Sequence, residues 1–299
     1  MPDTLVWLRW AQFVDLALVF GAPVTALLLG QRHLGGGWRL MLAIACPAGL
    51  ALTLSGFAVS MAAMADCAIA DLDHAMLMAI LCHSALGWSI IARLVGLMTG
   101  LGLALFCRRI PAGWLALSAG IAAASLAWGG HAAASQGGIG MVRLAGDIAH
   151  LWCGLAWLGA LMLFTVGLWR LRAADRPGMA QLLRHLSGFA LIGGILVGVL
   201  TISGLANLLF LAPPAQWGLM AATPYGMLIL AKLVMFALMF LLAAHNRFHL
   251  VPGLERAATS DAQRKALLAL RRSVSLEMLL ALAVVWCVAF AGTLDPMGG

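Results

Sequence analysis

The chain has 299 residues, of which 63% are hydrophobic and only 10% are charged, with a mean hydropathy of +1.00 and a formal net charge of +7. Soluble proteins carry about 25% charged residues, so this composition excludes a soluble globular protein and predicts an integral membrane protein. The net charge does not indicate nucleic-acid binding, because in a membrane protein the position of each Lys or Arg matters more than their sum. We therefore expect membrane lipids around the chain and no nucleic-acid partner.

Eight apolar stretches have the roughly 20 residues that a membrane-spanning helix needs. They cover residues 10–30, 40–65, 88–106, 110–128, 148–169, 186–211, 226–245 and 273–294. The first stretch has neither the basic n-region nor the small-residue cleavage site of a signal peptide, so we expect it to remain as a span. Residues 73–87 are predicted to be a short interfacial or re-entrant helix, or else an early extension of the third span. Residues 246–272 are predicted to be a loop with a helix on the membrane surface.

Basic residues are concentrated in the loops after the first, third, fifth and seventh stretches. These loops hold 14 of the 18 Lys and Arg residues, namely Arg32, Arg39, Arg108, Arg109, Arg170, Arg172, Arg176, Arg184, Arg247, Arg256, Arg264, Lys265, Arg271 and Arg272. The opposite side holds Arg9, Arg143 and several aspartates. By the positive-inside rule the basic side is cytoplasmic. The predicted fold is therefore all-α, a polytopic membrane helix bundle with eight transmembrane helices, both termini periplasmic, and a single membrane domain over residues 1–299.

Two histidines flank the junction between the fourth and fifth stretches. His131 follows the fourth stretch, and His150 begins the fifth, three residues after Asp147. Residues three apart share a helix face, so a helix that begins near Asp147 places Asp147 and His150 together, with His131 facing them across a Gly-rich loop. Two imidazoles and a carboxylate at one membrane boundary are typical of a metal site. The alternative is that each side chain caps a helix or meets solvent.

Further soft side chains gather on the predicted outer side, at Met61, Met64, Cys67, His74 and His83. Thioethers, thiolates and imidazoles suit Cu(I). Methionine is also a common gap-filling residue, so packing is the alternative role for the two methionines. Cys67 and Cys82 flank the same segment, and in an oxidising compartment they could pair; otherwise they are two free thiols.

Four polar side chains lie at a similar depth inside the predicted spans: Asp15, Arg93, Asn207 and Lys232. The three charged ones are five or six residues past the outer boundary, which corresponds to roughly 8–9 Å at 1.5 Å per residue. Charged side chains within a membrane are costly and usually face the bundle interior. We therefore predict one buried polar network, which either ties the helices together or takes part in transport.

Six stretches of the second half are distinctive in combination. They are GHAAA (130–134), DIAHLWCGLAWLGAL (147–161), SGLANLLFL (203–211), TPYGMLILAK (223–232), NRFHLVP (246–252) and RRSVSLEMLLALA (271–283). Together they resemble the CopD/PcoD family of bacterial inner-membrane copper-resistance proteins, and the resemblance covers most of the chain and is densest over residues 130–295. It implies an eight-span protein of the inner membrane that moves copper from periplasm to cytoplasm, and a periplasmic copper-binding partner resembling CopC.

The resemblance also bears on individual residues. His131, Asp147 and His150 match the histidine-bearing pattern of the family. Its other polar positions are matched by Asn207, Tyr225, Lys232 and Glu277. His74 and His83 match no fixed histidine of the family. The cargo is copper, and whether as Cu(I) or Cu(II) stays open.

These observations favour a copper transporter over an enzyme. No G-x-x-x-x-G-K-[ST] stretch occurs in the chain, which excludes a P-loop ATPase. One alternative is a b-type haem protein for electron transfer, with His131 and His150 as axial ligands. Another is a scaffold that delivers copper to an assembling oxidase without moving it across the membrane.

Overall fold

The computed structural model describes residues 2–129, 137–172, 175–211, 213–257 and 259–294. Helices account for almost all of them. They are α1 (Pro2–Leu16), η1 (Ala17–Gly21), α2 (Ala22–Leu28), α3 (Gly36–Ala65), η2 (Ile69–Asp71), α4 (His74–His83), α5 (Ala85–Phe106), α6 (Ala112–Ala124), η3 (Ser125–Gly129), α7 (Gly137–Arg170), α8 (Arg176–Leu211), η5 (Pro214–Gln216), α9 (Trp217–Ala221), α10 (Pro224–His245), η6 (Asn246–Leu250), α11 (Val251–Glu255) and α12 (Ser260–Ala291). Two short strands, β1 (His33–Leu34) and β2 (Ile110–Pro111), pair antiparallel.

Seven helical segments within the described ranges are long and apolar enough to cross a membrane. They are Asp3–Leu28, Gly36–Ala65, Ala85–Phe106, Gly138–Arg170, Pro177–Leu211, Pro224–Glu255 and Ser260–Ala291. The remaining predicted span, 110–128, is present as the shorter apolar segment Ala112–Trp128, made of α6 and most of η3. The predicted all-α polytopic bundle is confirmed, and the count of eight spans stays a prediction.

Two of the predicted helix boundaries are wrong. Helix α7 begins at Gly137 instead of residue 148, because its first turns are apolar and glycine is well tolerated in membrane helices. The expected surface helix within 246–272 is absent from the described residues of that segment: α10 continues through η6 and α11 to Glu255, and α12 begins at Ser260. Pro252 of α11 does not stop this continuation, because the π-helix η6 lies directly before α11, and such local changes of helix type accommodate proline within membrane helices.

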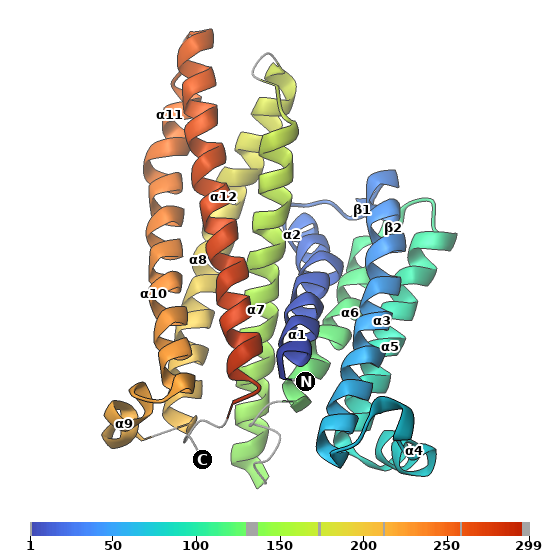
Figure 1. The fold of residues 1–299 in the computed structure, drawn as a ribbon. Helices are drawn as coiled ribbons and strands as arrows, with labels where there is room; N and C mark the ends of the chain where they lie inside the picture. Colours follow the sequence, from blue (N-terminus) through green and yellow to red (C-terminus); the bar gives the residue numbers. More distant parts are fainter. Residues whose placement is uncertain (1, 130–136, 173–174, 212, 258, 295–299) are drawn as a thin grey trace.

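The two ends of the bundle differ in charge, and we call them the basic end and, after the short helix that lies there, the α4 end. Figure 1 shows α4 and the strands β1 and β2 at opposite ends. At the basic end, β1 and β2 join the loops after α2 and α5, and arginines cap helix carbonyls: Arg39 Nε donates to Ala104 O at 2.9 Å and Arg271 Nε to Leu168 O at 2.8 Å. Such cations stabilise helix C-termini. The other end, the α4 end, also holds α9, the start of α1 and the end of α12. There the Arg9 guanidinium donates to the Gly292 carbonyl.

The core lies where the N-terminal helices meet α7. The spans Asp3–Leu28 and Gly138–Arg170 are the most buried, whereas Pro224–Glu255 is the least buried and exposes its apolar side chains to the outside. The Thr25 hydroxyl lies 2.9 Å from Gly21 O in its own segment and 3.3 Å from Ala156 O of α7. The bundle therefore surrounds α7, the helix that carries Asp147 and His150.

Candidate functional site

His150 lies well inside α7, more than three turns from the start of the helix, and its ring faces α8. The ring nitrogen Nδ1 is 2.8 Å from the hydroxyl oxygen of Ser203, and that hydroxyl is 2.6 Å from the carbonyl oxygen of Val199. The prediction that α7 starts near Asp147, which placed His150 at the membrane boundary, is therefore wrong. The histidine sits within the bundle.

The hydrogen bonds of Ser203 determine which ring nitrogen of His150 carries the proton. A hydroxyl has a single proton, and a carbonyl oxygen can only accept, so the Ser203 hydroxyl donates to Val199 O. Nδ1 of His150 must then donate to the Ser203 oxygen. In the neutral imidazole this leaves Nε2 with a free lone pair, the arrangement that a metal-binding histidine requires.

Three more side chains surround His150. Lys232 of α10 interacts electrostatically with the Asp147 carboxylate, with His150 and with the Cys287 thiol of α12. Asp147 is one turn before His150 on α7. Ammonium and carboxylate attract each other, so Lys232 and Asp147 stabilise each other's charge. Helices α7, α8, α10 and α12 thus each contribute to one polar cluster, consisting of Asp147, His150, Ser203, Lys232 and Cys287.

Space for the ring comes from α8. A Cβ atom at Gly204 would lie 3.4 Å from Cε1 of His150, so a larger side chain there would displace the imidazole. Next to it a largely apolar pocket of about 270 Å³ opens between α7 and α8. It is lined by Val142, Arg143, Gly146, Val199, Ile202, Ser203, Ala206, Asn207 and Phe210. The Arg143 guanidinium lies over the Phe210 ring, with 5.2 Å between Cζ and the ring centroid. The pocket therefore reaches Ser203, the hydrogen-bond partner of His150.

Four side chains were predicted to form one buried polar network: Asp15, Arg93, Asn207 and Lys232. In the structure each of them has different neighbours. Arg93 Nε donates to Ser125 Oγ at 2.9 Å, between α5 and η3. Asp15 faces α3, Asn207 lines the pocket on α8, and Lys232 belongs to the cluster around His150. Similar depth did not bring these side chains together, because they lie on helices that pack against different neighbours.

The soft side chains of the N-terminal half are only partly gathered. Met61 is 1% exposed and packs with Cys67 and Met76 in a small cluster under Leu72, whereas Met64 is 76% exposed. His74 and His83 are exposed at the two ends of α4. Cys67 and Cys82 are free thiols. The segment predicted at 73–87 is confirmed as a short helix, α4, whose N-terminus is capped by Asp73.

Within the described residues, no three His, Cys, Asp or Glu side chains come together as a metal site. His131, the second predicted imidazole, lies outside the described residues. The structure therefore describes two members of the predicted ligand set, Asp147 and His150. The full set with His131 stays a prediction.

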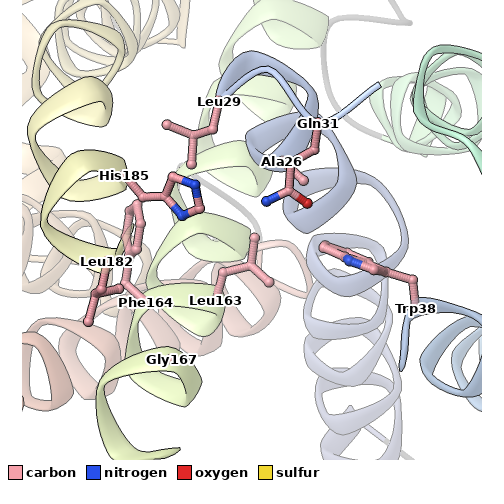
Figure 2. A pocket seen from close by; sticks show the side chains of 9 residues that line it. All are labelled: Ala26, Leu29, Gln31, Trp38, Leu163, Phe164, Gly167, Leu182 and His185. Atoms are coloured by element: carbon pink, nitrogen blue, oxygen red, sulfur yellow. The ribbon is translucent and has the colours of Figure 1, made fainter. Parts of the chain in front are cut away.

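A second pocket, of about 180 Å³, lies at the basic end between α2, α3, α7 and α8. Figure 2 shows the His185 ring and the Gln31 amide pointing toward it from opposite sides. Its other walls are mostly apolar. One imidazole and one amide are too few ligands to hold a metal ion, so we assign this pocket no part in metal binding.

Sequence reasoning missed Ser203 and the pairing of Lys232 with Asp147. A signal for Ser203 existed: it begins the stretch SGLANLLFL, in which Ser203 and Asn207 are four residues apart and therefore share a helix face. The interaction of Lys232 with Asp147 had no local signal, because the two residues lie on different helices and far apart in the sequence.

Comparisons of the sequence with known proteins identify a family. Residues 183–291 match the family model described as copper resistance protein D, and residues 1–141 match the one described as copper resistance protein D-like, N-terminal domain. Copper resistance protein D of Pseudomonas syringae pv. tomato is 33% identical over 308 residues, covering 99% of this chain and 98% of the relative. The chain belongs to the copper resistance protein D family. No solved structure matches it.

Membership of the copper resistance protein D family supports a role in copper resistance. Together with the seven long apolar helices, it indicates a multi-pass membrane protein. The two family models divide the site residues: Ser203, Lys232 and Cys287 fall within the second model, whereas Asp147 and His150 fall between the two and are covered by the full-length relative.

Proposed function

We propose that this protein carries copper across the bacterial inner membrane, from periplasm to cytoplasm, with His150 as the central ligand. The observation that supports this most directly is the hydrogen bonding of the His150 ring. Its protonated nitrogen is engaged by α8, so the other nitrogen is free to bind a metal ion. An imidazole in this state, inside a membrane bundle and one turn from a carboxylate, is suited to a transition-metal cation.

Lys232 gives the site a means of release. In the absence of copper, the Lys232 ammonium pairs with the Asp147 carboxylate. An arriving copper ion competes with the ammonium for the carboxylate and gains the free nitrogen of His150 as a second ligand. When the ion leaves toward the basic end, the pair of Asp147 and Lys232 forms again. His131 is the proposed third ligand, at the outer side.

Capture takes place at the α4 end, which the distribution of basic residues assigns to the periplasm. Exposed soft side chains are present there, among them Met64, His74 and His83. We assign to them and to Met61 and Cys67 the first contact with copper handed over by a periplasmic protein resembling CopC. Thioethers, thiols and imidazoles bind Cu(I) and exchange it readily, which suits transfer between proteins.

The proposal is tested by copper content. Cells that express the chain are compared with cells that do not, in copper-supplemented medium, and cytoplasmic copper is measured separately from periplasmic copper. We expect expression to raise cytoplasmic copper and His150→Ala to abolish the rise at normal membrane abundance. His33→Ala, at the exposed start of β1, is the matched control and should behave like wild type.

Other outcomes identify the competing functions. Accumulation of copper that stays periplasmic would contradict the proposed direction. Unchanged cellular copper, with impaired copper loading of an oxidase in cells that lack the chain, would favour the delivery scaffold. A Soret absorption band in the purified protein that disappears in His150→Ala would replace the copper transporter with a haem protein.

A further inference from the structure

Asp15 is a buried carboxylate, and no basic side chain within the described residues is paired with it. It lies near the middle of the span Asp3–Leu28, is 6% exposed, and its Oδ2 atom has no hydrogen-bond partner. The other buried carboxylate, Glu277, is 4% exposed but accepts a hydrogen bond from Asn246 Nδ2 at 3.1 Å. A buried polar group without a partner is costly, so its retention in an apolar span calls for a ligand.

A second buried polar side chain lies one turn away on the same face of α1. Gln12 is 5% exposed, and its amide faces Thr53 of α3, with 3.0 Å between Gln12 Oε1 and Thr53 Oγ1. The Thr53 hydroxyl is also 2.7 Å from Gly49 O, and because it has one proton it donates to that carbonyl. The Thr53 oxygen can then only accept a hydrogen bond from Gln12, so we assign the NH2 group to the end of the amide that faces Thr53. The oxygen and nitrogen of an amide have nearly the same shape, so the hydrogen bonds decide between the two orientations.

With this orientation the amide oxygen of Gln12 takes the position of the buried amide atom that lacks a partner. Two unpartnered oxygens, one from Gln12 and one from Asp15, then face the boundary between α1 and α3. Two oxygen acceptors without a donor are the arrangement that a cation satisfies.

A buried thiol lies on the same face of α3 as Gly49, one turn away. The Cys46 thiol of α3 is fully buried and lies within the electrostatic reach of Asp15. Gly49, three residues further along α3, makes room for the carboxylate, because a Cβ atom there would overlap Oδ2 of Asp15. The described ranges show no basic side chain paired with this carboxylate, since Arg93 bonds Ser125 and Lys232 interacts with Asp147.

Both helices are irregular at this level. The π-helix η1 begins two residues after Asp15, and Pro47 follows Cys46 inside α3. Proline removes a helical hydrogen bond, and π-turns are frequent at functional sites. Within a membrane, such irregular backbone is typical of the places where ions bind.

We propose that Asp15, Gln12 and Cys46 form a second copper site, inside the N-terminal half and separate from His150, that binds Cu(I). The charge is balanced if the carboxyl and thiol together give up one proton to solvent, which leaves one negative charge for one monovalent cation. The sulphur selects Cu(I) over Na⁺ or K⁺. The identity of the ion rests on the proposed copper function, so the test below reports on the two sites separately.

The test is the number of Cu(I) ions bound by the purified full-length protein under anaerobic conditions, measured by competition with a chromogenic Cu(I) chelator. We expect two high-affinity ions in the wild type, one in Asp15→Asn, one in His150→Ala and, in the double variant, only the weak, readily exchanged binding of the side chains at the α4 end. Glu277→Gln, which alters the other buried carboxylate, should keep both. Copper-edge X-ray absorption should lose a sulphur ligand in Cys46→Ser but not in Cys107→Ser.

A steric pair of variants tests the geometry without changing any ligand. Gly49→Ala places a methyl group against Asp15 and should remove one ion, whereas Gly56→Ala on the same helix meets nothing within 4 Å and should keep both. Two ions in both Asp15→Asn and Gly49→Ala would overturn the second site, whatever His150→Ala shows. Loss of an ion in Asp15→Asn but not in His150→Ala would support the second site and count against His150. Displacement of the ion at the Asp15 site by Na⁺ would overturn its assignment to Cu(I).

Discussion

Gly21 of η1 and Gly159 of α7 are in direct backbone contact. A Cβ atom at Gly159 would overlap backbone atoms of Gly21 and Ala22, and a Cβ atom at Gly21 would overlap the backbone of Leu155. Small residues allow such close approach between membrane helices, where packing rather than the hydrophobic effect drives association. This contact fixes the N-terminal helices, which carry Asp15, against the helix that carries His150.

The first prediction concerns that contact. Gly159→Ala should destabilise the protein by more than the roughly 1–3 kcal/mol of ordinary overpacking, because the overlapping atoms belong to the backbone and cannot rotate away. Gly138→Ala, on the same helix with nothing within 4 Å, should have no such effect. The measurement is the melting temperature of the detergent-solubilised protein, together with its abundance in the membrane. Equal melting of the two variants would mean that the helices do not meet at Gly159.

The second prediction concerns Ser203 as the partner that orients His150. Ser203→Ala removes the acceptor of the Nδ1 proton, and loss of such a partner typically weakens metal binding by ~10–100-fold. Thr201→Ala is the matched control, since the exposed Thr201 hydroxyl bonds only Val197 O of its own helix, at 2.8 Å. The measurement is the affinity for Cu(I) by chelator competition. An unchanged affinity in Ser203→Ala would remove this hydrogen bond from the mechanism.

Much of the fold could be predicted from the sequence because lipid imposes one strong constraint. Every spanning helix needs an apolar stretch of a given length, so the stretches at 40–65 and 88–106 correspond closely to α3 and α5. Helix ends in the polar regions carry no such constraint. There the Gly-rich loop predicted before Asp147 is helical from Gly137 onward, and the loop predicted from residue 246 onward is helical as far as Glu255. Glycine and proline do not stop a helix in a membrane protein as they do in a soluble one.

The candidate site was less accessible to sequence reasoning. Asp147 and His150 are neighbours along one helix, so their spacing predicted their shared face. Ser203, Lys232 and Cys287 come from three other helices, and which of these face α7 depends on helix rotation and packing. Depth below the membrane surface, which grouped Lys232 with Asp15, describes position along the membrane normal and contains no information about neighbours in the membrane plane.

The third prediction concerns orientation. The start of α1 and the end of α12 lie together at the α4 end, and the positive-inside rule assigns the opposite, basic end to the cytoplasm. A reporter that is active only in the periplasm should work when fused after Gly299 and be silent when fused after Arg172, which follows α7 at the basic end. A reporter active only in the cytoplasm should give the inverse result. Activity of the periplasmic reporter after Arg172 would reverse the proposed orientation and with it the direction of transport.

The last prediction concerns the competition between Lys232 and copper for Asp147. Lys232→Leu removes the ammonium while keeping an apolar side chain on α10, so a bound copper ion no longer has a competitor for the carboxylate. We expect more copper to stay with the purified protein after dialysis, and uptake into vesicles to fall at least tenfold because release is slowed. Lys232→Arg keeps the positive charge and should transport better than Lys232→Leu.

The two measurements together distinguish release from a structural role. If Lys232 only ties α10 to α7, Lys232→Leu should lower the melting temperature and the bound copper together, since stranding a buried charge typically costs ~3–5 kcal/mol. Retained copper at a normal melting temperature, combined with slow uptake, is the result that a release role requires. Asp147→Asn provides the complementary case: it removes the charge for which both cations compete, so combining it with Lys232→Leu should abolish the extra copper retention.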